Sequence, residues 1–191
     1  MTVTELDLEL SLDDWSHPAD RDDLALLELC VGPTIDVGCG PGRLTEALGT
    51  LGHVVLGIDA TPEAVGHALR RGGAALHRDV FSPLPGEGRW HTALLADGNI
   101  GIGGDPVRLL SRLARLLDPT CGRVVAELAP PGTQPSTGRA TLRDGGRLTF
   151  TFPWSVVGVD DIDRLVGLAG FHGHAVHRVG QRWCAVLETS L

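Results

Sequence analysis

The segment TIDVGCGPGRL (residues 34–44) places three glycines and a proline between an apolar run and leucines at helical spacing. Glycine adopts positive φ without strain and lets a ligand approach the backbone closely. A buried strand, a glycine-rich loop and a helix, in this order, are typical of an open α/β sheet, where the helix N-terminus points free N–H groups at a bound molecule. The segment therefore predicts a small-molecule site at the carboxyl end of a strand.

Apolar strand-like runs and amphipathic segments alternate through residues 20–129. Thr61-Pro62 and Asp105-Pro106 each combine an N-cap residue with a proline at the first helical position. Strands alternating with helices predict a mostly parallel sheet with helices on both faces. The expected strands are 33–38, 53–59, 74–80, 91–97 and 122–128, and the expected helices are 21–30, 43–52, 62–71 and 105–117.

The pattern changes after Leu128. A loop leads into a β-hairpin around Asp144-Gly145, and a last helix is followed by two strands that pair antiparallel. Residues 1–19 are acidic, and we expect them to be irregular. One domain over residues 1–191 is expected, with an N-terminal tail or lid (1–19), a ligand-binding core (20–129), a hairpin insertion (130–157) and a C-terminal helix with a β-hairpin (158–191).

Length, charge and cysteine usage narrow the class of protein. A chain of 191 residues forms one domain by length, and its net charge of -8 argues against a nucleic-acid partner. The four cysteines form no C-x-x-C pair, which predicts free thiols and no metal site. The sequence has no secretory leader and no apolar run long enough for a bilayer, so we expect a cytoplasmic protein without membrane contact.

Two familiar glycine-loop sites do not fit the spacing. A dinucleotide loop needs G-x-G-x-x-G, but Arg43 holds the last position and the third glycine comes one residue early, at Gly42. A P-loop needs a G-K-[ST] ending, which is missing. A nicotinamide oxidoreductase is therefore disfavoured.

The run IDVGCGPG (residues 35–42) resembles motif I of the class I S-adenosylmethionine-dependent methyltransferases. The resemblance implies a Rossmann-like α/β fold with a seven-stranded, mostly parallel sheet, an antiparallel last strand, helices on both faces and, here, a β-hairpin inserted after the fifth strand. It also implies S-adenosyl-L-methionine as cofactor and S-adenosyl-L-homocysteine as product. More narrowly, GPTIDVGCGPGRL, GGAAL, PLPGEGRWHTALLADGNIGIGGDP and GQRWCAVL resemble a group of small actinobacterial methyltransferases of unassigned substrate.

The resemblance also implies roles for acids that follow the strands. Asp59 would bind the ribose hydroxyls or, alternatively, cap the next helix. Asp79 would bind the adenine amino group, with Val80 beside the ring, or serve as a turn residue. Asp36 would lie near the methionine ammonium group or accept hydrogen bonds from the loop. The implied cofactor-binding residues are Asp36, Gly38, Cys39, Gly40, Gly42, Asp59, Ala60, Asp79, Val80 and Asp97.

No residue stands out as a nucleophile or base, because DGNIGIGG after the fourth strand lacks the N/D-P-P-Y/F motif of amino-directed methyltransferases. Asp97 and Asn99 are expected beside the sulfonium group or in an ordinary turn. The N-terminal tail, with Trp15 and His17, would close over the site or be disordered. Trp154 would roof the acceptor or fill the core. The catalytic candidates are His17, Asp97, Asn99 and Trp154.

The expected reaction is direct methyl transfer to O, N or C of a small molecule, and secondary metabolism is one setting for it. Holding the acceptor in line supplies much of the acceleration, and a base is needed only when the acceptor must lose a proton. A nucleic-acid methyltransferase and a non-catalytic S-adenosylmethionine-binding module remain alternatives. The chain is expected to be a monomer or homodimer. His172, His174 and His177 are expected to share one polar strand face without a metal.

Overall fold

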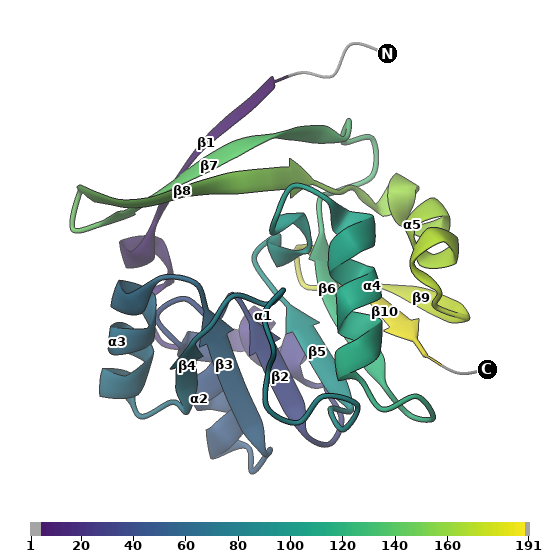
Figure 1. Ribbon diagram of the computed structural model, residues 1–191, viewed down its shortest axis with the longest axis horizontal. Coiled ribbons are helices and arrows are strands. Elements are labelled where there is room, and N and C mark those ends of the chain that lie inside the picture. The colour runs from purple at the N-terminus through teal and green to yellow at the C-terminus, as the bar shows by residue number, and fades with distance from the viewer. Residues whose placement is uncertain (1–4, 190–191) are drawn as a thin grey trace.

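A computed structural model describes residues 5–189 and contains two β-sheets (Figure 1). The larger sheet has seven strands in the order β4-β3-β2-β5-β6-β10-β9, of which β2 to β6 run parallel. Strand β10 is antiparallel to both of its neighbours, which confirms the predicted sheet with its antiparallel last strand. The strands are β2 (Thr34–Val37), β3 (Val55–Asp59), β4 (Ala75–His77), β5 (Thr92–Leu95), β6 (Arg123–Leu128), β9 (Gly173–Val179) and β10 (Arg182–Glu188).

Helices cover both faces of this sheet, as the alternating pattern predicts. The leucines of α4 and α5 pack in one apolar core, whereas those of α1 and α2 pack in another on the opposite face. Helix α3 packs beside α2 and strands β3 and β4. Within residues 5–189, no helix is both long enough and apolar enough to cross a membrane. The helices are α1 (Arg21–Leu27), α2 (Arg43–Thr50), α3 (Pro62–Arg71), α4 (Pro106–Leu116) and α5 (Ile162–Ala169), with 3-10 turns η1 (Leu12–Trp15), η2 (Asn99–Gly101) and η3 (Val159–Asp161).

Two strands of the large sheet end at least two residues earlier than the sequence suggests. Strand β4 ends at His77 and β5 ends at Leu95, so Asp79 and Asp97 lie in the following loops and not in the strands. Both loops turn at once, through bonds from Ser82 N to the Asp79 carbonyl oxygen and from Asn99 N to the Ala96 carbonyl oxygen. Asp59 ends β3 as predicted.

The second sheet has three strands, β1 (Glu5–Ser11), β7 (Ser136–Asp144) and β8 (Arg147–Val156). The predicted hairpin is β7 and β8, and this expectation is confirmed. The expectation that residues 1–19 are irregular is wrong for residues 5–15, which form β1 and η1, and β1 pairs in parallel with β7 along its whole length. Residues 1–4 lie outside the described part of the chain. Leu6, Leu8 and Leu10 alternate with polar residues, and this alternation is a strand signal. The polar residues between them are acidic, however, and acidic residues are uncommon in strands.

We call this three-stranded sheet the roof. It lies across the end of the large sheet at which the parallel strands finish (Figure 1). We call the opposite side, formed by the carboxyl ends of β2 to β5 and the loops that follow them, the floor. Leu10, Leu12 and Leu142 form a small apolar cluster with Trp15 and Phe152, and this cluster joins η1 to the roof.

Candidate functional site

A cavity of about 360 Å³ lies between the floor and the roof. Its floor side carries carboxylates and the glycine loop, whereas its roof side is almost entirely apolar. The cavity therefore offers polar groups to one part of a ligand and an aromatic surface to another. The lining residues from η1 and the roof sheet are Leu10, Leu12, Trp15, Leu142, Phe150, Phe152, Pro153 and Trp154.

The three glycines of the loop after β2 have different neighbours, although all have positive φ. A Cβ on Gly38 would lie 2.8 Å from Nδ2 of Asn99, and one on Gly42 would lie 2.6 Å from Cβ of Ala68 in α3. A Cβ on Gly40 would have no heavy atom of the described residues within 4 Å and would stand in the cavity. Gly40 therefore leaves room for a ligand, whereas Gly42, predicted to bind cofactor, lets α2 and α3 pack and does not line the cavity.

Asp59 joins the glycine loop to the start of α3. Its Oδ2 accepts a hydrogen bond of 3.0 Å from the Gly40 N–H, and its Oδ1 accepts one of 2.8 Å from the Thr61 N–H. The Thr61 hydroxyl also donates to Oδ1. Asp59 lines the cavity as well. The structural role at the helix start and the position for ligand binding therefore belong to the same carboxylate.

The loop after β4 forms another part of the floor. Asp79 is exposed, lines the cavity and accepts a 2.9 Å bond from the Phe81 N–H at Oδ1. Val80 is buried beside it, and its carbonyl oxygen accepts a 2.9 Å bond from Nε of Arg112. Arg112 also donates to Ser82 and Glu87, so this arginine of α4 holds the loop in place. Sequence analysis missed it, because nothing near Arg112 in the chain indicates that its side chain is buried.

Asp36 is almost fully buried behind the glycine loop and lines the cavity. Its Oδ2 accepts a 2.6 Å hydrogen bond from the Thr45 hydroxyl of α2, so its described partner is a helix side chain and not the loop N–H groups. Burial raises the pKa of Asp36 to about 6. Cys39 and Ala60 line the same region.

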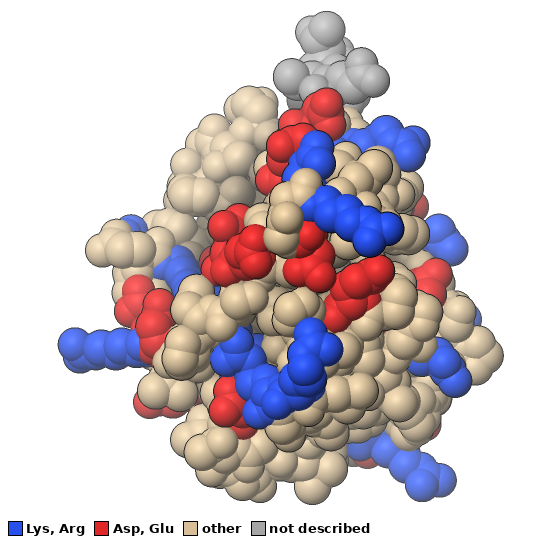
Figure 2. Space-filling model, turned by 90° about the vertical axis from the view of Figure 1, so that its left-hand side faces the viewer, with Lys and Arg blue, Asp and Glu red and all other residues tan. Residues whose placement is uncertain are grey.

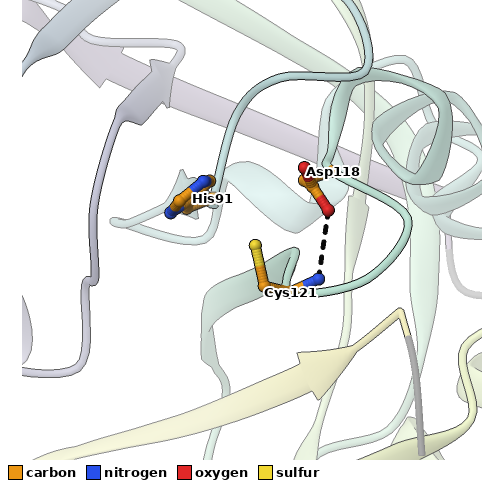
Figure 3. A group of neighbouring side chains, drawn as sticks. All are labelled: His91, Asp118 and Cys121. Carbon is orange, nitrogen blue, oxygen red and sulfur yellow. Dashed lines mark hydrogen bonds between the residues drawn. The ribbon is translucent and has the colours of Figure 1, made fainter.

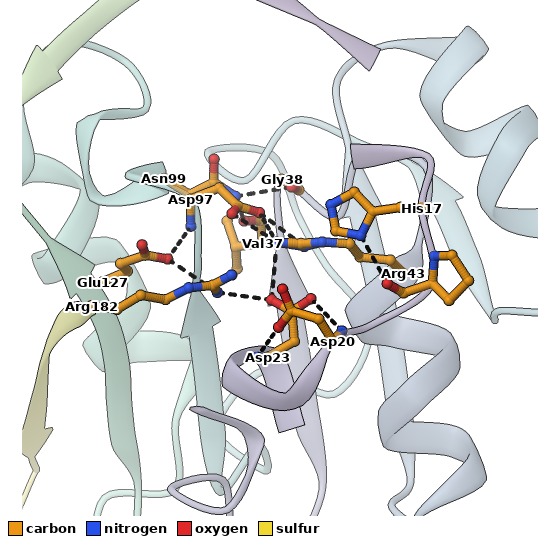
Figure 4. Close-up of polar contacts among 11 residues, drawn as sticks. His17, Asp20, Asp23, Val37, Gly38, Arg43, Asp97, Asn99, Glu127 and Arg182 are labelled. Atoms are coloured by element: carbon orange, nitrogen blue, oxygen red, sulfur yellow. Dashed lines mark hydrogen bonds and ion pairs between the residues drawn. The ribbon is translucent and has the colours of Figure 1, made fainter. Parts of the chain in front are cut away.

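Arg43 lies at the centre of a network of charges under the floor (Figure 4). The side chain is 3% exposed and binds Asp97 through distances of 2.8, 3.0 and 3.2 Å, and its Nη2 lies 3.2 Å from Asp23. Asp97 has a left-handed backbone, with φ of 54°, and its N–H donates to Glu127 at 2.8 Å. Arg43 therefore holds a strained residue in place from below.

Arg182 of β10 completes this network. Its guanidinium lies 2.8 Å from Asp23 and 3.8 Å from Glu127 (Figure 4). Burial raises the pKa of Asp97, a change that Arg43 opposes, and burial also raises the pKa of Glu127. When all groups are ionised, three carboxylates face two guanidinium groups, and one negative charge remains uncompensated beneath the cavity. Arg182 lies in the run GQRWCAVL and Glu127 in the expected strand 122–128, but nothing in either segment indicates that the two side chains meet Asp23 and Asp97.

The structure brings three of the expected acceptor-side residues to the cavity. Asn99 donates from Nδ2 to the carbonyl oxygens of Val37 and Gly38, both at 2.9 Å, which leaves its Oδ1 as an acceptor. Trp154 is buried and meets Phe152 edge-on, with ring centroids 5.6 Å apart. Trp15 is half-buried, and all three of Asn99, Trp154 and Trp15 line the cavity.

His17 differs from the other catalytic candidates. It is exposed, its ring nitrogen Nδ1 lies 2.8 Å from the Pro18 carbonyl oxygen, and it does not line the cavity. The chain turns away after η1 to reach the cap of α1, and this turn carries His17 outward. Asp97 lines the cavity but engages Arg43 with both oxygens. Neither residue is placed as a general base.

The sheet order, the glycine loop after β2 and the cavity at the strand ends define a class I methyltransferase fold. Residues 35–125 match the family described as "Methyltransferase domain". A ubiquinone biosynthesis O-methyltransferase from Xanthomonas euvesicatoria pv. vesicatoria is 31% identical over 156 residues, which cover 76% of this chain and 56% of that protein. The chain thus spans little more than half the length of this relative.

Solved structures share the fold over most of the chain. A SAM-dependent methyltransferase from Bacteroides fragilis in complex with S-adenosyl-L-homocysteine has a TM-score of 0.71 at 19% identity and covers 90% of this chain and 78% of its own. The 1,6-didemethyltoxoflavin-N1-methyltransferase of Burkholderia thailandensis has a TM-score of 0.64 at 21% identity and covers 93% and 82%. At these identities the likeness establishes the fold.

Proposed function

We propose that the protein is an S-adenosylmethionine-dependent methyltransferase whose acceptor is a small, largely apolar molecule. The observation that carries this proposal is that one cavity joins a polar floor to an aromatic roof. The matching methyltransferase domain and relatives named as O-methyltransferases support it.

The floor fits S-adenosylmethionine in shape and charge. Gly40 leaves open space where a side chain would stand, and Asp59 and Asp79 offer carboxylate oxygens to hydroxyl and amino groups. The carboxylates of Asp36 and Asp59 line the cavity near the glycine loop and, when ionised, favour a ligand with a cationic end. Asp59 would hold the ribose, Asp79 and Val80 the adenine, and the loop from Asp36 to Gly40 the methionine end. The bound cofactor supplies a methyl group activated on a sulfonium.

The residues of this chain act in the reaction mainly by positioning the acceptor. The roof covers one side of the cavity, and an acceptor held in line beneath it needs little further assistance. Asn99 Oδ1 faces no described donor and can orient an acceptor N–H or O–H. Because Asp97 is bound to Arg43, proton removal by a side chain of the floor is not part of the proposed mechanism.

The roof indicates the chemical class of the acceptor. Phe150, Phe152 and Trp154 offer aromatic surface, and Arg108 stacks over Phe81 with 4.1 Å between the guanidinium carbon and the ring centroid. Such surfaces suit a planar, partly apolar acceptor with a heteroatom nucleophile. The relatives' names include one O-methyltransferase and one N1-methyltransferase, so oxygen and nitrogen acceptors are both within the proposal.

A nucleic-acid acceptor and a non-catalytic binding module are the alternatives. On the face that carries α3, acidic and basic side chains are interspersed without a continuous basic stripe (Figure 2). Together with the net charge of -8, this favours a small molecule over nucleic acid. A binding module would keep the floor and bind S-adenosylhomocysteine, but it would transfer no methyl group.

Methyl transfer from S-adenosylmethionine with a deuterated methyl group tests the proposal. The protein is incubated with small phenols, aromatic amines and N-heterocycles, and mass spectrometry detects labelled products. Gly40→Val should abolish labelling and weaken S-adenosylhomocysteine binding by more than about tenfold, because the side chain fills the cavity. Gly132→Val, at another positive-φ glycine with open space around it, is the matched control. Labelling of oligonucleotides alone, or equal loss in the control, contradicts the proposal.

Three further expectations belong to the same proposal, namely the location, the oligomeric state and the group of the protein. We infer that it is cytoplasmic and that it is a monomer or homodimer. We also infer that it belongs to the actinobacterial group named above. Light scattering after gel filtration measures the oligomeric state, and fractionation of the source cells tests the location.

A further inference from the structure

A second group of reactive side chains lies at the opposite end of the parallel strands from the cavity. His91 directly precedes β5, and Asp118 and Cys121 lie in the turn between α4 and β6 (Figure 3). One ring nitrogen of His91, one carboxylate oxygen of Asp118 and the Sγ of Cys121 all lie within 4.8 Å of one another. Nothing in the proposed methyl transfer uses this group.

The backbone around these side chains is held firmly. His91 donates its N–H to the Pro33 carbonyl oxygen at 2.9 Å, and its own carbonyl oxygen accepts a 2.8 Å bond from the Arg123 N–H. The Asp118 N–H donates to the Trp90 carbonyl oxygen at 2.8 Å. Backbone hydrogen bonds therefore fix both the start of β5 and the turn between α4 and β6, and the three side chains converge from rigid backbone.

The side chains are also fixed in orientation. Oδ1 of Asp118 accepts bonds from the Thr120 N–H at 2.8 Å, the Thr120 hydroxyl at 2.6 Å and the Cys121 N–H at 3.2 Å, and Oδ2 takes part in none of these three bonds. The Cys121 side chain is also hydrogen-bonded to Asp118, and a bound ion would replace this contact. The His91 ring packs against Gly32, where a Cβ would lie 2.3 Å from Nδ1. Both segments are thus shaped before any ion arrives, which lowers the entropy cost of binding one.

We propose that His91, Asp118 and Cys121 bind a divalent zinc-class cation, with water at the remaining position. Imidazole nitrogen, thiolate sulfur and carboxylate oxygen are the three ligand types that zinc takes in proteins, usually four at a time in tetrahedral geometry. The thiol excludes magnesium and calcium as the preferred ions, because both favour oxygen ligands. The ion would link the start of β5 to the turn before β6 and strengthen the sheet at that end.

This proposal differs from the sequence-based expectation that the chain has no metal site. That expectation weighed cysteine spacing and the late histidines. The structure separates those histidines: His174 pairs with Asp163 at 2.9 Å, and His177, three residues along β9, points to the opposite face of the strand. The group at His91 escaped notice because its members come from distant parts of the sequence.

Zinc titration of the untagged, chelator-stripped protein tests the site, with a chromophoric chelator as competitor. One equivalent of zinc should bind, and His91→Ala and Cys121→Ser should each weaken binding by more than about tenfold. Asp118→Asn should also weaken binding while its amide oxygen still accepts the turn bonds. His172→Ala, an exposed histidine elsewhere, should change nothing. Binding that survives Cys121→Ser unchanged overturns the proposal.

Thiol reactivity gives a second measurement that does not depend on affinity. Cys30, Cys39 and Cys184 are buried and Cys121 is exposed, so a chromogenic disulfide reagent reads Cys121 in the folded protein. Saturating zinc should slow this reaction by more than about tenfold in the wild type, since the metal-bound sulfur is shielded. The protection should be lost in His91→Ala. An unchanged rate at saturating zinc, in protein with a bound ion, overturns the assignment of Cys121 as a ligand.

Discussion

The floor and the roof enclose the same cavity, but they are built in different ways. The floor comes from strands and loops that follow one another in the chain, and each strand has a carboxylate at its end or in the next loop. The roof joins β1 to β7, with most of the chain between them. Local sequence motifs therefore predict the floor. The roof depends on pairing between distant segments, which no short motif predicts.

The two sides also differ in chemistry. Buried charged side chains such as Asp36 and Arg43 gather in and under the floor, and burial raises the pKa of Asp36. The roof contributes leucine and aromatic side chains. If this division is functional, changes in the floor should affect stability and cofactor affinity. Changes in the roof should affect the acceptor alone.

Removing the buried cation under the floor should have the largest effect. Arg43→Met leaves Asp97 without its ion-pair partner and Asp23 with Arg182 alone, and breaking a buried ion pair in this way typically costs about 3–5 kcal/mol in the free energy of unfolding. Urea denaturation measures the loss. Arg70→Met, at an exposed position of α3, is the matched control and should change stability by less than about 0.5 kcal/mol. An equally small loss of stability in Arg43→Met would show that the charge network does not stabilise the floor.

Removing the buried carboxylate of Asp36 should raise the free energy of unfolding, whereas removing Arg43 lowers it, and the gain should depend on pH. The pKa of Asp36 rises from 3.8 to about 6 on folding, so ionisation disfavours the folded state. The destabilisation is absent below the unfolded pKa, grows as pH rises toward 6 and is complete above it. Asp36→Asn should therefore be more stable than wild type by about 3 kcal/mol at pH 7.5 and equal to it near pH 3.5. Urea unfolding of both proteins at the two pH values measures this difference, and a pH-independent difference would contradict it.

Two substitutions of Asp59 distinguish its role in ligand binding from its role as a helix cap. Asp59→Ala removes charge-assisted hydrogen bonds worth about 1.5–3 kcal/mol, so S-adenosylhomocysteine affinity should fall by roughly one to two decades. Asp59→Asn should cost less, since its amide oxygen still accepts from Thr61. Calorimetry measures the affinities and thermal melting measures stability. Lower stability with wild-type affinity in both variants would leave Asp59 as a cap only.

The smallest expected effect on the cofactor comes from a change in the roof. A Cβ on Gly138 of β7 would lie 2.0 Å from the Leu6 carbonyl oxygen of β1, so Gly138→Ala must displace β1. S-adenosylhomocysteine affinity should stay within about twofold of wild type, while the acceptor KM rises by about tenfold, equivalent to ~1.4 kcal/mol. Gly167→Ala in α5, where a Cβ meets nothing, is the control. An equal loss of cofactor affinity would mean that the two sides are not separable.

The same contrast explains how much the sequence predicted. The order of elements from α1 to β10 followed from helical spacing, caps and strand patterns, whereas the resemblance to class I methyltransferases implied that Asp36, Asp59 and Asp79 lie at the ligand site. The strand β1 did not, because acidic residues hid its alternation and its partner lies far along the chain. Arg43 was noticed only as a charge beside the loop, since its partners Asp23 and Asp97 come from separate elements. His17 was predicted to lie at the ligand site, but it does not line the cavity, because the turn after η1 could not be predicted from composition.

The parallel pairing of β1 with β7 also sets an order of events during synthesis. Residues 5–11 leave the ribosome long before residues 136–144 exist, whereas one helix separates β2 from its neighbour β3, and one helix separates β3 from its neighbour β4. The strands of the floor can therefore pair during translation, and β1 must wait, with its alternating leucines uncovered, until the hairpin has been made. Enclosure of the cavity is thus a late event in the production of each molecule, after the strands around the glycine loop have been made.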